Sequence, residues 1–334
     1  MNTVREITAD DFGKWDDFLR KSPQGSIFHT IAWNQMLVET DPRLAGFLPL
    51  ANFDKDGNIL AGLVIPYRLV AGRKVADRPT FGYGGPVLAD SLRYTERHHA
   101  YSSHTAVVGL LEALESDFDF VRFWNAPDIW DVRSYMFQLW KLRAVYTHQW
   151  TCAPIDEAWA RIKPEWQSLI RTREQSDQLK VDESGQYDAV YISLASRGKD
   201  ALAPEVIQKR LQWLRSTGNG QLYVLGNASG RALAMTLAIL SRENESVYLW
   251  HTVSEGNASQ VLPALFWQLY ASLAGNFKRI DLGPSDGIAI SQLKDALGCN
   301  LLPTFLASYC GGGQGTSRRK GESKLEGESP VGGE

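Results

Sequence analysis

Hydrophobic and polar positions in the first 150 residues follow two periods, which predicts a mixture of strands and helices. Runs rich in branched and aromatic residues are typical of strands, and apolar residues three and four positions apart are typical of helices. The turn DKDGN joins the first two strands into a hairpin. Strands are predicted at 46–53, 59–70, 119–124 and 143–150, a strand broken by glycines at 79–88, and helices at 91–116 and 132–140.

The second half repeats this order of elements. The segment SEGNAS, residues 254–259, has more small and polar residues than a turn needs. It precedes a helix whose apolar residues form one stripe, namely Leu262, Leu265, Phe266, Leu269 and Leu273. Strands are predicted at 221–225, 231–240, 247–252, 279–283 and 300–309, and further helices at 156–175 and 288–298.

Both halves therefore contain hairpin strands, a glycine-rich strand end, a helix, a strand, a loop with proline and aspartate, a helix and a strand. DFVRFWNAPD and FKRIDLGPSD occupy the same place in the two halves. This duplication predicts an α/β protein with mixed sheets in two similar units, residues 1–150 and 151–310. Residues 311–334 hold mostly glycine, serine and charged residues, so we expect a disordered tail.

Composition and charge argue against several classes of protein, such as nucleic-acid-binding, secreted and membrane-spanning proteins. The chain of 334 residues is 44% hydrophobic and carries a net charge of −3, which gives no general footprint for nucleic acid. Three cysteines fit a reducing compartment, the N-terminus has no signal pattern, and no apolar run approaches the ~20 residues of a membrane span. We therefore expect a cytoplasmic protein. His98, His99 and His104 give no i, i+4 pair on one helix face, so we expect no metal.

Four segments resemble one family of enzymes. SIFHTIAWNQML is similar to its N-terminal helix start, FGYGGPVL to its Gly-Pro strand, WQSLIRTREQ to the helix that opens its second half, and RIDLGPSDGIAISQLKDALG to its C-terminal motif. Together, in this order, they resemble the Fem-type aminoacyltransferases and the related Fem-like acetyltransferases. The resemblance implies two tandem GNAT-like units and an acyltransferase. Leu293 and Leu297 replace the phenylalanines usual in the last motif.

The resemblance also implies a donor and an acceptor. An acyl group would pass to an amino group of a peptide, a sugar or a cell-envelope precursor such as that of peptidoglycan. The arginine-rich helical arm of some tRNA-dependent members is missing, which favours acyl-CoA over aminoacyl-tRNA as the donor. A catalytically silent GNAT-fold binding module is the alternative, and the oligomeric state is open.

The segment 254–259 is the candidate donor site. In GNAT folds the bend before a helix presents backbone N–H groups to a pyrophosphate, and the positive end of the helix dipole adds to the attraction. Ser254, Gly256 and Asn257 would do so here, although Val253 stands where the family's fingerprint has Arg or Gln. A capped turn is the alternative interpretation, which Glu255 favours unless its carboxylate points away.

The remaining candidates fall into two groups, residues that would line the acceptor site or bind the substrate and residues that would take part in the chemistry. Tyr83, Gly84 and Gly85 either wall an acceptor site or form a glycine bulge, and Trp33 and Arg171 match family positions. Arg171 would meet a phosphate or carboxylate, or lie on a solvated face.

Trp250 and His251 end a strand that faces the bend, so His251 is a candidate base or an ordinary packed histidine. Asp281 is a further candidate. Lys294 lies beside the apolar stripe of its helix, in the family's lysine position, where it would contact phosphate or the reacting acyl group or else pair with Asp295. The sequence shows no catalytic triad.

Overall fold

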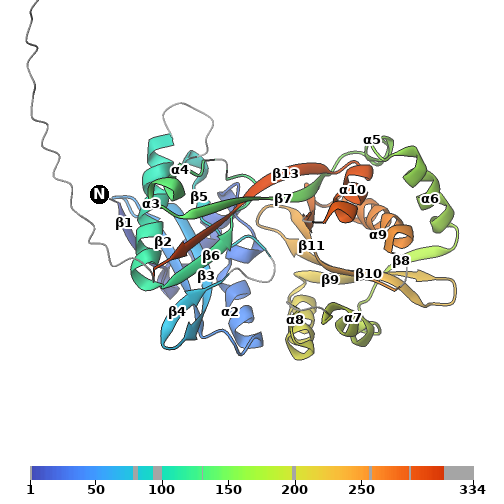
Figure 1. Cartoon of the computed structure of the whole chain (residues 1–334), viewed down its shortest axis with the longest axis horizontal. Coiled ribbons are helices and arrows are strands. Elements are labelled where there is room, and N and C mark those ends of the chain that lie inside the picture. The colour runs from blue at the N-terminus through green and yellow to red at the C-terminus, as the bar shows by residue number, and fades with distance from the viewer. Residues whose placement is uncertain are drawn as a thin grey trace, which may run out of the picture.

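The computed structural model describes residues 2–77, 82–92, 100–129, 131–197, 201–255, 258–285 and 287–311. Its strands form one sheet with the order β1-β2-β3-β4-β6-β13-β7-β12-β11-β10-β9-β8, and β5 pairs with β3 beside this path. Helices lie over both faces of the sheet (Figure 1). The mixture of strands and helices predicted from the hydrophobic pattern is confirmed.

In the first half, β2 and β3 form an antiparallel hairpin with a helix on each of its faces, and β6 runs parallel to β4. Its elements are β1 (Thr3–Glu6), η1 (Ala9–Asp11), α1 (Phe12–Lys21), η2 (Ile27–His29), α2 (Ile31–Thr40), β2 (Gly46–Phe53), β3 (Ile59–Val70), β4 (Arg73–Ala76), β5 (Val87–Leu88), η3 (Asp90–Leu92), α3 (Ala100–Asp117), β6 (Phe120–Trp124), α4 (Arg133–Phe137) and β7 (Lys141–Thr151).

The second half opens with two helices and a strand, continues with two further helices and three antiparallel strands, and ends with two helices that alternate with two strands. Its elements are α5 (Ile155–Ala160), α6 (Pro164–Glu174), β8 (Asp177–Val181), α7 (Asp188–Ala195), α8 (Pro204–Thr217), β9 (Gly220–Asn227), β10 (Ala232–Ser241), β11 (Ser246–Ser254), α9 (Ala258–Leu273), β12 (Arg279–Pro284), α10 (Ile288–Ala296) and β13 (Asn300–Cys310).

Two long strands connect the halves. β13 is the last strand of the chain, but its second part pairs with β6 of the first half, from Leu306↔Trp124 to Cys310↔Phe120. β7 ends the first half, but it pairs with β12 of the second. β7 and β13 also pair with each other along nine positions. Together they run from one lobe of the molecule to the other (Figure 1). Each half therefore completes the sheet of the other.

Several predicted elements have different limits in the structure. Residues 156–175 form two helices, because Pro164 begins α6 and holds the preceding Lys163 in an extended conformation. The helix predicted at 132–140 ends at Phe137, and Leu139 has φ +60° before β7 begins. In the strand expected at 79–88, only β5 is paired among the described residues. α1, α7, α8 and β8 were not predicted.

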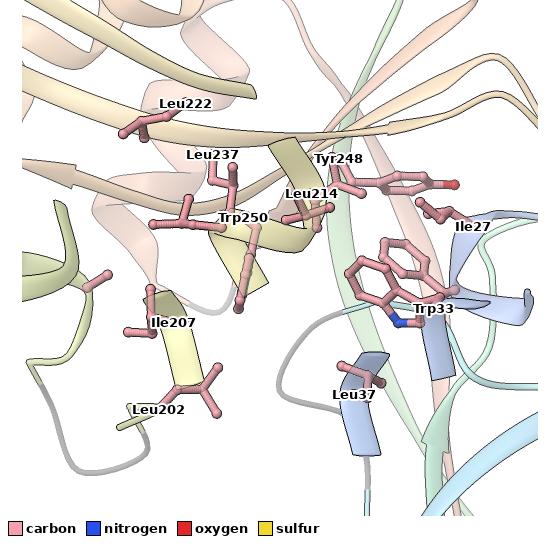
Figure 2. Close-up of a cluster of buried hydrophobic side chains, with 14 of the residues drawn as sticks. Ile27, Trp33, Leu37, Leu202, Ile207, Leu214, Leu222, Leu237, Tyr248 and Trp250 are labelled. Carbon is pink, nitrogen blue, oxygen red and sulfur yellow. The ribbon is translucent and has the colours of Figure 1, made fainter. Parts of the chain in front are cut away.

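A large hydrophobic cluster fills the space between the halves. Ile27, Trp33 and Leu37 from η2 and α2 meet residues of α8, β9, β10 and β11 (Figure 2). Thr30 caps α2 by accepting a hydrogen bond from Trp33 N at 3.1 Å, which sets the start of the helix that carries Trp33. Because α2 and α8 pack against each other, the interface of the halves is a continuous core.

Candidate active site

The parallel strands β11 and β12 separate part-way along their length. They pair at Ser246↔Arg279, Val247↔Ile280 and Tyr248↔Asp281. β11 then continues to Ser254 paired only with β10, with an irregular register between Met235 and Leu237. A Cβ built on Gly283 would lie 3.7 Å from the carbonyl oxygen of Leu249, so the strands are still close at that point although their pairing has ended. The helix α9 starts a few residues after the separated end of β11.

In the first half, the protein's own backbone fills the position beyond the corresponding pair of parallel strands. β4 and β6 pair in parallel at Val75↔Phe120 and Ala76↔Val121. At the end of β6, both Gly84 N and Gly85 N donate to the carbonyl oxygen of Trp124 at 3.0 Å. A Cβ on Gly85 would lie 2.5 Å from Asn125 Oδ1, so only glycine fits there. The two glycines thus close this place with their own backbone.

His29 secures the same glycine pair from the other side. Its Nε2 donates to Gly85 O at 3.1 Å, and its Nδ1 lies 2.9 Å from Ser26 Oγ. Burial lowers the pKa of His29 to about 4. The imidazole is therefore neutral near pH 7, with both nitrogens hydrogen-bonded.

Asp281 joins the two halves through a buried network. Its carboxylate accepts hydrogen bonds from Tyr83 Oη at 2.6 Å, Thr147 Oγ1 at 2.7 Å, Gln149 Nε2 at 2.9 Å and Gly283 N at 2.8 Å. Burial and the negative charge of Asp281 raise the pKa of Tyr83 well above its ordinary value, so its hydroxyl remains a donor. The structure thus brings together Tyr83 and Asp281, 198 positions apart in the chain. With four donors on it, this carboxylate acts as an anchor.

His251 lies on the separated part of β11 in an uncommon conformation. Its φ is +48°, which non-glycine residues seldom adopt and which clusters at functional sites. Its Nε2 is buried and has no hydrogen-bond partner among the described residues. Burial and the charge of Arg210 lower the pKa of His251, so the ring is neutral near pH 7. A buried neutral nitrogen of this kind can accept a proton from a ligand.

Arg210 is a buried cation that the sequence analysis missed. The residue is 4% exposed, its Nε donates to Thr40 Oγ1 at 3.3 Å, and its guanidinium lies 3.7 Å from Asp41 Oδ2 and 5.8 Å from the Trp250 ring centroid. Burial lowers its pKa to about 10. Asp41 is already held by two shorter hydrogen bonds from the Arg43 side chain. The signal for this residue was an arginine in the apolar stripe of Val206, Ile207, Leu211 and Leu214.

The aromatic candidates belong to the core between the halves. Trp33 is 4% exposed and makes edge contacts with Phe28 at 5.2 Å and Trp213 at 6.1 Å between ring centroids. Trp250 is buried in the same cluster, and its carbonyl oxygen accepts from Tyr191 Oη at 3.1 Å. These rings join the halves and support the strand on which His251 lies.

The candidate donor segment is described in part. Gly256 and Asn257 lie outside the described residues, whereas Ser254 ends β11 half-buried. The carboxylate of Glu255 pairs with Arg231 at 2.8 Å, so it points to the β10 side of the bend. Arg173, on α6, donates to Gln260 in the first turn of α9 at 3.4 Å. Arg171 is exposed and stacks over Trp159 at 5.3 Å, without reaching the Tyr83–Asp281 network.

Lys294 is buried rather than solvated. It is 2% exposed, and its Nζ donates to Gly283 O and Pro284 O at 2.9 Å and to Ser285 Oγ at 3.2 Å. The ammonium group therefore lies at the C-terminal end of β12, beyond the last pair of β12 with β11. His98 and His99 lie outside the described residues, and the described part of the chain holds no group of three metal-ligating side chains.

Comparison with solved structures identifies the architecture. FemX superposes with a TM-score of 0.66 at 11% identity, covering 91% of this chain and 96% of FemX. The tandem GNAT protein of the clavulanic acid biosynthesis pathway gives 0.54 at 12%, covering 94% and 99%. The chain has the tandem GNAT fold. L-PGS from Bacillus licheniformis shares it, with a TM-score of 0.55 at 12% identity over 93% of this chain and 94% of that protein.

At these identities the tandem GNAT likeness shows the fold alone. No protein-family model and no curated protein matches the sequence. Within the described residues, no helix is long and apolar enough to cross a membrane.

Proposed function

We propose that the protein is an N-acyltransferase that moves an acyl group from acyl-CoA to an amino group of a peptide, a sugar or a cell-envelope precursor. One observation carries this proposal, namely that His251, on the strand that separates from β12, has a buried Nε2 with no hydrogen-bond partner in the described part of the chain. The separation leaves one edge of β11 without a β12 partner beyond Tyr248 among the described residues. Backbone groups there can bind the amide groups of an extended ligand as a neighbouring strand would.

The proposed chemistry assigns His251 to the acceptor. An alkyl ammonium has a pKa of about 10, so the amine needs a base to become a nucleophile. His251 is neutral near pH 7 because of burial and of Arg210, so it is available for that proton. Arg210 would attract an anionic group of the acceptor, and Asp281 would position Tyr83 and β12 rather than exchange protons.

The proposed donor site lies where β11 leads into α9. The helix N-terminus favours an anion, and the carboxylate of Glu255, which argues against phosphate, is paired with Arg231. Ser254, Gly256 and Asn257 would supply polar groups, and Arg171 and Arg173 lie on the helix that contacts the first turn of α9. Aminoacyl-tRNA stays the less favoured donor, because the chain lacks the helical arm of tRNA-dependent relatives.

A thermal-shift series tests the donor. We expect acetyl-CoA or a longer acyl-CoA to raise the melting temperature by several degrees, because a ligand at 100 times its Kd adds about 2.7 kcal/mol. Ser254→Glu should abolish the shift by placing a carboxylate at the bend, whereas Gln212→Glu, on the exposed face of α8, should keep it. Stabilisation by CoA without turnover of any amine would instead support the silent binding module, and no shift with any acyl-CoA would contradict the donor.

A further inference from the structure

A chain of hydrogen bonds links a serine just after β12, a histidine on β7 and an aspartate on α10. Ser285 Oγ lies 2.5 Å from Nδ1 of His148, on β7. Nε2 of the same ring lies 2.8 Å from Asp295 Oδ1, on α10. The side chain of His148 is fully buried, that of Asp295 is 50% exposed, and Ser285 is half-buried. None of these three residues belongs to the Asp281 network.

The partners determine the direction of these hydrogen bonds. A carboxylate only accepts, so the proton of a neutral imidazole lies on Nε2, against Asp295. Nδ1 is then an acceptor and faces the hydroxyl of Ser285. This is the functional order of a serine–histidine–aspartate triad, with the two ring nitrogens exchanged relative to the common arrangement. Such sites are recognised by geometry and not by chain order, which explains why residues 148, 285 and 295 gave no motif.

Lys294 adds a fourth element. Its ammonium donates to Ser285 Oγ at 3.2 Å, and the carbonyl oxygens of Gly283 and Pro284, at the end of β12, hold it in place. A fixed positive charge beside a hydroxyl stabilises the alkoxide that forms as the proton leaves. The backbone N–H of Ser285 donates to Tyr146 O at 3.1 Å, which fixes the loop on β7. The hydroxyl is therefore oriented from three sides.

His251 lies on β11 beyond its last pair with β12, and Ser285 directly follows β12. Both residues therefore follow Tyr248 and Asp281, the last paired positions of the two parallel strands.

We infer that Ser285 carries the acyl group as a covalent ester during the transfer, which rests on the proposed acyltransferase function. Ser285 Oγ attacks the thioester carbonyl of the donor, His148 takes the hydroxyl proton, and the C–S bond breaks. The thiolate leaves and receives that proton. The amine then attacks the ester, the C–O bond breaks, and Ser285 Oγ recovers a proton from the amine. Donor and acceptor are thereby converted to thiol and amide, and the serine is regenerated.

A fluorophosphonate probe tests the serine without any donor, since it phosphonylates activated serines. In the full chain we expect peptide mass spectrometry to find the label on Ser285. Ser285→Ala should remove it, and Ser291→Ala, on the same helix as Lys294 and Asp295, should leave it unchanged. Asp295→Asn should slow labelling at least tenfold and shift its pH profile, because Asp295 acts through His148 as a positioning residue. An unlabelled Ser285 in the wild-type protein overturns the inference.

Acylation provides the second measurement. After incubation with the stabilising acyl-CoA and rapid quenching, we expect a mass increase of one acyl group on Ser285 that hydroxylamine removes, and Ser285→Cys should keep this capture as a thioester. A folded Ser285→Ala protein that transfers acyl groups at the wild-type rate would overturn the inference while leaving the proposed function intact. Labelled Ser285 with no acylation by any acyl-CoA would overturn the proposed donor while supporting the activated serine.

Discussion

Replacing His251 with asparagine is expected to lower kcat/KM for acyl transfer by about 10²–10⁴-fold near pH 7, the usual contribution of a positioned general base. Asparagine tolerates positive φ better than most residues, so the strained backbone at φ +48° is retained and the fold should persist. The matched control is His104→Asn, in the first half, where the ring bonds Ser134 Oγ at 2.9 Å. Steady-state kinetics and melting curves of both variants decide the outcome.

The pH profile distinguishes a base from a packing residue. Protonated His251 cannot accept a proton, so kcat/KM should fall on the acid side as pH drops through the pKa of His251. Burial and Arg210 lower that pKa, so the fall should begin below the ordinary value of about 6.5. Arg210→Met removes one of the two causes of the lowered pKa, so the acid limb of the profile should move to higher pH. An unchanged limb in Arg210→Met, or an active His251→Asn, would contradict the role of His251.

Replacing Lys294 with methionine is expected to reduce the transfer rate at least tenfold and also to reduce the free energy of unfolding by about 2–3 kcal/mol. The sequence alone predicts that Lys294 contacts phosphate or the reacting acyl group, or else pairs with Asp295. The structure changes that expectation, because the buried ammonium holds Gly283 O, Pro284 O and Ser285 Oγ. Losing it leaves these acceptors without their charged donor and releases the loop that carries Ser285.

Two comparisons sharpen the Lys294 measurement. Lys278→Met removes a lysine whose side chain is 73% exposed, so its unfolding free energy should change by no more than about 0.5 kcal/mol. Lys294→Arg keeps the charge and should recover part of the activity. Urea unfolding and single-turnover transfer report the two effects separately. A Lys294→Met protein with wild-type stability and transfer rate would contradict both roles of Lys294.

Local periodicity predicted most strands and helices but not their partners. The hairpin of β2 and β3 follows from two apolar runs around DKDGN, so it could be predicted from the sequence. The pairing of β13 with β6 joins residues about 180 positions apart, and no periodic pattern encodes such a distance. The exchange of β7 and β13 between the halves therefore could not be predicted from the sequence, although the repeated order of elements could.

The same limit applies to the candidate site. The run SEGNAS suggests a donor site from the sequence alone, with a capped turn as the alternative, and its role stays a prediction. The contact of Tyr83 with Asp281 and that of Arg210 with Thr40 depend on how the halves pack, which the sequence does not state. His148, Ser285 and Asp295 come from three separate elements and meet only in the folded chain.

Hydrogen–deuterium exchange with and without saturating acyl-CoA tests the central claim, that the donor binds where β11 and β12 separate. We expect slower exchange in peptides covering the end of β11 with the start of α9, and in those covering the loop after β12. Peptides covering β4 and β6 should exchange at unchanged rates, because the chain itself closes that place through Gly84 and Gly85. Protection confined to β4 and β6, or no protection with any acyl-CoA, would contradict it.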